Sequence, residues 1–90
     1  MRHEERIKAE AIMTFLKHKI EWLESFIENR QIIRDTGTGT HLPQVEDHLI
    51  ELTKDILNDD RRNFEKLKKK YRDRHPYSEL PSSLLLETEA

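Results

Sequence analysis

Two long stretches of the chain, residues 4–35 and 44–74, contain neither glycine nor proline, and the only two glycines, Gly37 and Gly39, lie between them. Glycine and proline are the residues that most weaken a helix interior, so each stretch can continue as one helix. We predict helices over about 4–35 and 43–74, joined by a loop at 36–42. Pro43 suits the first turn of the second helix, and His75 before Pro76 favours its end.

Apolar residues recur at helical spacing in both stretches. The first stripe comprises Ile12, Leu16, Ile20, Leu23 and Ile27, widened by Phe15, Trp22, Phe26 and Ile33. The second comprises Val45, Leu49, Leu52 and Ile56 and continues with Phe64, Leu67 and Tyr71, with Ile50 and Leu57 flanking it. Such faces are wider than a coiled-coil seam and indicate a helix with more than one neighbour. The sequence therefore predicts an all-α antiparallel helical hairpin at residues 1–75 that dimerises into a four-helix bundle.

Composition supports association. Apolar residues make up 34% of the 90-residue chain and charged residues 38%, which is lean for a domain that must stand alone. The absence of cysteine excludes disulfides and thiolate chemistry. The charged beginning is unlike a signal peptide. No apolar run is longer than three residues, the length of Leu84–Leu86, which is far too short to span a bilayer. We expect a cytoplasmic protein with no membrane partner.

The segment 76–90 differs from the rest in composition. It is acidic and contains proline, serine and leucine, and Ser82 or Ser83 would cap a short final helix. Its apolar residues Leu84, Leu85 and Leu86 are candidates for docking on the bundle or on a partner protein. Trp22 is most simply a core residue together with Phe15 and Phe26, but Trp22 and Phe26 are also candidate docking residues because tryptophan is a frequent interface anchor.

Charge is organised along the hairpin although its sum is only −2. Residues 20–60, at the loop end, carry −7, whereas residues 1–19 and 61–75, at the open end, carry +8. Helix dipoles explain part of this pattern. Two such hairpins would also prefer to meet antiparallel. An alternative hypothesis is that the protein binds nucleic acid. Six basic residues of the second helix are then the candidate phosphate contacts: Lys66, Lys68, Lys69, Lys70, Arg72 and Arg74.

The loop "RDTGTGTHLPQ" suggests a phosphate cradle at first sight. A P-loop needs a lysine directly after its last glycine, and a dinucleotide motif needs a third glycine where Leu42 stands. Both patterns fail. We predict instead that Gly37 ends the first helix in a left-handed conformation.

A polar interruption in each helix points to a buried layer. The run Asn58–Asn63 places Asp60 on the apolar register, so either the helix rotates or a carboxylate faces the core. Pairing the helices about the loop brings Asp59 and Asp60 opposite Lys17 and His18, within about one turn, so that their partners are expected in the run Lys17–Lys19. We interpret these four residues as a polar layer that fixes the register, because buried polar groups penalise wrong alignments. A catalytic or metal-binding role for His18 with the two aspartates is a weaker alternative.

No spacing of acids or histidines defines a metal or catalytic site. The Glu-x-x-His of di-iron bundles is absent, and the Glu-Glu-x-x-Glu of MazG-like nucleotide hydrolases fails because Lys8 follows Glu4 and Glu5. A metal-dependent hydrolase using Glu24, Glu28, Glu51 and Asp55 at the loop end is thus the weakest alternative. We expect no cofactor and no enzyme activity. The sequence favours a regulatory or adaptor protein that binds itself and another protein.

Overall fold

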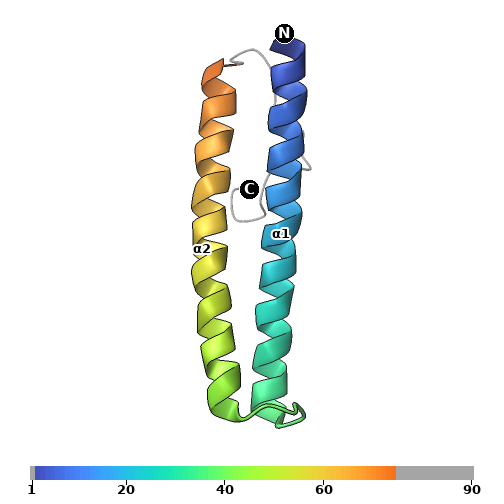
Figure 1. Cartoon of the computed structure of the whole chain (residues 1–90), viewed down its shortest axis with the longest axis vertical. Helices are drawn as coiled ribbons and strands as arrows, with labels where there is room; N and C mark the ends of the chain where they lie inside the picture. The colour runs from blue at the N-terminus through green and yellow to red at the C-terminus, as the bar shows by residue number, and fades with distance from the viewer. Residues whose placement is uncertain (1, 75–90) are drawn as a thin grey trace.

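The computed structural model describes residues 2–74 of the chain. It consists of α1 (Arg2–Thr36) and α2 (Pro43–Arg74), which lie side by side and antiparallel, with the loop at one end and the beginning of α1 beside the end of α2 at the other (Figure 1). The predicted all-α helical hairpin is confirmed. The segment 76–90, with the predicted final helix and Leu84, Leu85 and Leu86, lies outside the described residues.

The core is a single layer between the two helices. Its buried apolar side chains are Met13, Ile20, Leu23 and Ile27 from α1 and Ile50, Leu57, Phe64 and Tyr71 from α2. Ala9, Leu16 and Leu67 pack at its margin. We call the side of each helix that carries these residues the inner face. Met13 is completely buried although the sequence stripe did not include it.

The first half of α2 is rotated relative to the predicted stripe. Ile50 and Leu57, expected only to flank it, are buried, whereas Val45, Leu52 and Ile56, expected at its centre, are exposed. The buried positions of α2 run in steps of three and four from Glu46 to Tyr71 and include Asp60. The carboxylate of Asp60 therefore faces the core without any change of register along α2. The second helix thus carries two apolar stripes. The stripe that includes Glu46 and Asp60 packs against α1, and the stripe of Val45, Leu52 and Ile56 is exposed.

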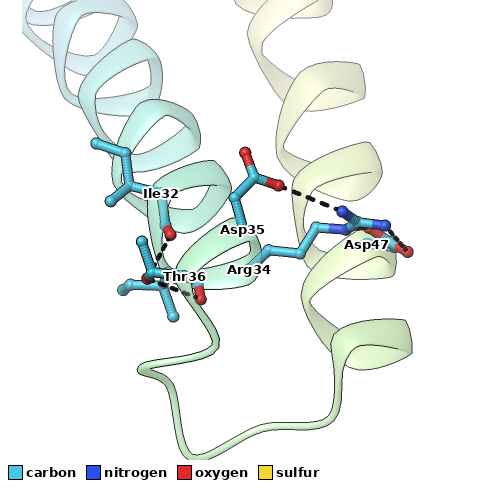
Figure 2. A network of polar contacts seen from close by, with 6 residues as sticks. Ile32, Arg34, Asp35, Thr36 and Asp47 are labelled. Atoms are coloured by element: carbon cyan, nitrogen blue, oxygen red, sulfur yellow. Dashed lines mark hydrogen bonds and ion pairs between the residues drawn. The ribbon is translucent and has the colours of Figure 1, made fainter.

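Gly37 ends α1 as predicted. Its φ is +67°, in the left-handed region that favours glycine, and its N–H donates to the carbonyl of Ile33 at 3.0 Å. The Thr36 hydroxyl donates to the carbonyl of Ile32 at 2.7 Å (Figure 2). Gly39 lies so close to Ile33 that a Cβ there would meet the Ile33 methyl at 2.5 Å. The two glycines thus serve the turn and a close approach of the loop to α1.

Candidate functional site

A second apolar surface lies on the outside of the hairpin. Phe15 is 67% exposed, Trp22 62% and Leu52 58%. The other members are exposed or half-buried. We call this surface the outer apolar face; it comprises Ile12, Phe15, Trp22 and Phe26 of α1 and Val45, Leu49, Leu52 and Ile56 of α2. Phe15 and Trp22 were expected in the core of a dimeric bundle, and the single hairpin leaves them uncovered, as is expected of Trp22 in one copy alone.

The two parts of the outer apolar face lie on the same side of the hairpin. At about 100° per residue, Ile12, Phe15 and Trp22 lie to one side of the buried Ile20, and Leu52 and Ile56 are offset in the same sense from the buried Leu57. When two helices are antiparallel, stripes that are rotated in the same sense from the two buried faces lie on the same side of the hairpin. The opposite side is polar: Glu24, Lys54, Asn58 and Arg61 line a shallow depression of about 310 Å³ there.

Aromatic stacking organises the centre of the outer apolar face. The rings of Trp22 and Phe26 stack with their centroids 5.2 Å apart and their planes at 24°. The Arg30 guanidinium lies 5.7 Å from the centroid of Phe26, within the range of a cation–π contact. Isolated exposed apolar residues are ordinary on soluble proteins, but a contiguous patch marks an interaction site.

At the open end, the same side of the hairpin holds a groove of about 240 Å³. Ala9, Ile12, Leu67 and Tyr71 form its apolar lining. The rest of the lining is charged and exposed, and consists of Glu5, Lys8, Lys70 and Arg74. We call this the open-end groove; it combines an apolar floor with an excess of positive charge.

Tyr71 and Glu10 join the two helices below this groove. The Tyr71 hydroxyl donates to Glu10 Oε1 at 3.1 Å. Burial, with a smaller contribution from the Glu10 carboxylate, raises the pKa of Tyr71 above its ordinary value. The tyrosine is therefore held in its neutral, hydrogen-bonded form.

Near the loop, a buried ion pair links the helices. Arg30 Nη1 lies 3.2 Å from Glu46 Oε1, and Glu46 is only 1% exposed. Its other oxygen, Oε2, has no hydrogen-bond partner among the described residues. Arg34 also pairs with Asp47, as Figure 2 shows, and Asp47 raises the pKa of Arg34. Neither pair was predicted from the sequence, although pairing the helices about the loop places Arg30 and Arg34 opposite this acidic turn of α2.

The predicted polar layer exists at only one of its four residues. Asp60 is buried and its Oδ2 lies 3.1 Å from Lys19 Nζ, without the alignment of a hydrogen bond. Lys17, in contrast, pairs with Glu21 on its own helix at 2.8 Å and lowers the pKa of Glu21.

The remaining two members are also placed differently from the prediction. Asp59 pairs with Arg62 at 2.9 Å, and His18 is exposed. The structure therefore does not bring Lys17 and His18 to Asp59 and Asp60: Lys17 is half-buried beside Glu21, and His18 is exposed. The interaction across the helices is made by Lys19, the last residue of the predicted run Lys17–Lys19.

The six candidate phosphate contacts do not form one surface. Lys66, Lys69, Lys70, Arg72 and Arg74 are exposed, whereas Lys68 is 3% exposed. Its ammonium group lies 3.4 Å from Glu65 and 6.0 Å from the centroid of the Phe64 ring. Nucleic-acid binding stays a prediction, with five exposed bases in place of six.

Among residues 2–74, acidic and histidine side chains form no group of three that could hold a metal ion. Glu24, one of the four loop-end acids, lies instead 3.5 Å from Arg61. Within the same residues, neither helix has an apolar segment of the length needed to cross a bilayer.

Comparison of the chain with protein-family models, with curated proteins and with solved structures gave no match.

Proposed function

We propose that this chain is a non-enzymatic interaction protein that works by packing its outer apolar face against helices of another molecule, the first of which is a second copy of itself. The observation that carries the proposal is the exposure of Phe15, Trp22 and Leu52 on one side of the hairpin. Their burial would add to the thin core, since full burial of one such side chain contributes roughly 1.5–3 kcal/mol. A four-helix bundle is the simplest assembly that buries this face.

The dimensions of the hairpin suit such a dimer. The structure measures 52 × 20 × 16 Å, so one broad side is about 1,000 Å² in projection for each copy. Stable interfaces between proteins bury roughly 1,200–2,000 Å² in total. The broad side that contains the outer apolar face is therefore large enough for a specific dimer without any contribution from the polar side.

Charge favours an antiparallel two-fold arrangement. Residues 20–60 carry −7, and residues 1–19 with 61–75 carry +8. Copies packed with like ends together would place these charges against their own kind, whereas antiparallel copies place each acidic loop end beside a basic open end. A regulatory or adaptor role follows if a further protein competes for this face or binds the exposed surface of the bundle.

The test is the molar mass in solution of three matched proteins, measured by light scattering at micromolar concentration. The native chain and Ile32→Glu, whose isoleucine is 54% exposed but lies away from the outer apolar face, should have twice the 10.9 kDa chain mass. Leu52→Glu should be monomeric with its helix content retained. A monomeric native chain, or a dimer that Leu52→Glu leaves intact, contradicts the proposal.

A further inference from the structure

The open-end groove adjoins the outer apolar face at Ile12 but differs from it because its rim is charged. Lys8, Lys70 and Arg74 exceed the single acid, Glu5, around a floor that includes Ile12, 50% exposed. A ligand complementary to this groove would carry apolar side chains flanked by carboxylates. A purely apolar helix would leave the cations unpaired, and a purely acidic chain would leave the floor uncovered.

We propose that the occupant of the open-end groove is the chain's own segment 76–90. Its sequence has the required pattern: Leu84, Leu85 and Leu86 are preceded by Glu79 and followed by Glu87 and Glu89. The segment contains no base, so its charge is −3. It would place leucines on Ile12 and Leu67 and carboxylates beside Lys8, Lys70 and Arg74.

The position of the segment along the chain favours this occupant over an acidic peptide from another protein. Arg74, the last described residue, is itself part of the groove rim. Leu84 follows ten residues later, and ten residues span up to about 33 Å when extended. The groove spans only residues 67–74 of α2, about 11 Å along the helix. The segment can therefore turn back at the Pro76–Pro81 region and reach the floor with length to spare.

Tethering makes a modest intrinsic affinity sufficient. A short linker holds a ligand near its site at an effective concentration in the millimolar range. The three leucines and the ion pairs at the rim then need to supply only weak binding for the groove to be occupied most of the time. Since rim pairs are screened by salt, occupancy should fall as ionic strength rises.

This proposal does not rest on the dimer. The groove takes up about one fifth of the length of the hairpin, and Trp22, Phe26, Leu52 and Ile56 lie outside it. About 800 Å² of the projected area of this broad side remains for each copy. This equals one partner's share of a standard interface. The two occupants would meet at Ile12, so the segment would limit how far a second copy extends toward the open end.

The absence of native cysteine gives a direct test. A full-length chain with Ile12→Cys and Leu85→Cys reports proximity to the groove through disulfide formation in a glutathione buffer. The matched control carries Ile7→Cys with Leu85→Cys; Ile7 is 51% exposed on the same helix but does not line the groove. Both proteins also carry Leu52→Glu, so that the result is independent of dimerisation.

We expect the disulfide within one chain to form at least about tenfold more favourably with position 12 than with position 7. Adding Lys8→Glu and Lys70→Glu should remove most of this preference. Equal formation at the two positions would overturn the proposal, because the segment would then sample both sides alike. Products formed only between chains would also overturn it and would assign the groove to the segment of a second copy. If the preference for position 12 persists after Lys8→Glu and Lys70→Glu, the charged rim does not contribute to binding of the segment.

Discussion

The inner face and the outer apolar face contain the same kinds of residue at the same helical spacing, yet one is buried and the other is exposed. Ile20, Leu57 and Phe64 are at most 5% exposed, whereas Phe15, Trp22 and Leu52 are more than half exposed. The difference lies in the polar residues that accompany them. Glu46 and Asp60 share the inner face of α2 and meet cations of α1 there, Arg30 and Lys19.

We infer from this difference that charge selects between the two apolar stripes. If the stripe of Leu52 and Ile56 packed inside, Glu46 and Asp60 would be turned away from Arg30 and Lys19. The observed rotation keeps two ion pairs across the helices and leaves the purely apolar stripe free for a partner. Apolar residues supply the driving force for folding, and we propose that the buried charges determine which side of α2 faces α1.

The largest expected effect separates the two faces directly. Leu57→Ala removes a buried side chain and should lower the free energy of unfolding by about 2–5 kcal/mol at any protein concentration. Leu52→Ala is the matched change on the same helix. It should cost little in dilute solution, and its cost should grow with concentration because it acts through association. Urea unfolding at two protein concentrations measures both, and equal costs for the two variants would abolish the distinction.

The next effect concerns the ion pair that orients α2. Arg30→Met leaves the buried Glu46 carboxylate without its cation and should cost about 3 kcal/mol. Arg62→Met, which removes an exposed partner of Asp59, should cost at most about 1 kcal/mol. Adding Glu46→Gln to Arg30→Met should recover part of the loss, since a neutral amide is less costly to bury. If Arg30→Met and Arg62→Met are equally mild in chemical denaturation, charge does not select the inner face.

A smaller effect is expected at the turn that connects the two faces. Gly37→Ala places a Cβ at a φ of +67° and should cost roughly 1–2 kcal/mol. Gly37→Asn should cost less, because asparagine tolerates the left-handed region better than alanine. Thermal unfolding of the two variants distinguishes the contributions. An alanine variant as stable as the native chain would show that the turn adopts another conformation in solution.

The smallest effect is a pH dependence at the open end. Because the pKa of Tyr71 is raised in the folded chain, its contribution to stability is complete below the unfolded pKa of about 10. That contribution is lost as pH rises through the folded pKa. Tyr71→Phe should therefore show a shallower loss of stability than the native chain as the pH rises above about 10. Parallel curves would mean that burial and the Glu10 carboxylate do not raise the pKa of Tyr71 in the folded chain.

Much of the fold was predictable, because the absence of glycine and proline from 4–35 and 44–74 and their presence in the loop set two helices and one turn. The side of α2 that faces α1 was not predictable. Val45, Leu52 and Ile56 form as regular a stripe as Ile50, Leu57 and Phe64, and periodicity alone cannot rank them. The burial of Glu46 was also missed, since an acid in the first turn of a helix is already explained by the helix dipole.

The exposure of Trp22 on the outer apolar face agrees with its choice as a candidate docking residue. The docking role of Trp22 and Phe26 stays a prediction. In the polar layer, the residue of the run Lys17–Lys19 that meets Asp60 is Lys19, one position beyond His18. Such a shift is smaller than the precision with which a seven-residue loop fixes the pairing of two helices.

The central claim, that a second copy covers the outer apolar face, is tested most directly by the fluorescence of Trp22, the only tryptophan in the chain. Its emission should be that of a buried indole at tens of micromolar. It should shift to that of a solvent-exposed indole on dilution, with the same midpoint as the fall in molar mass. An emission spectrum of an exposed indole at every concentration would contradict the account, because it would leave the outer apolar face uncovered.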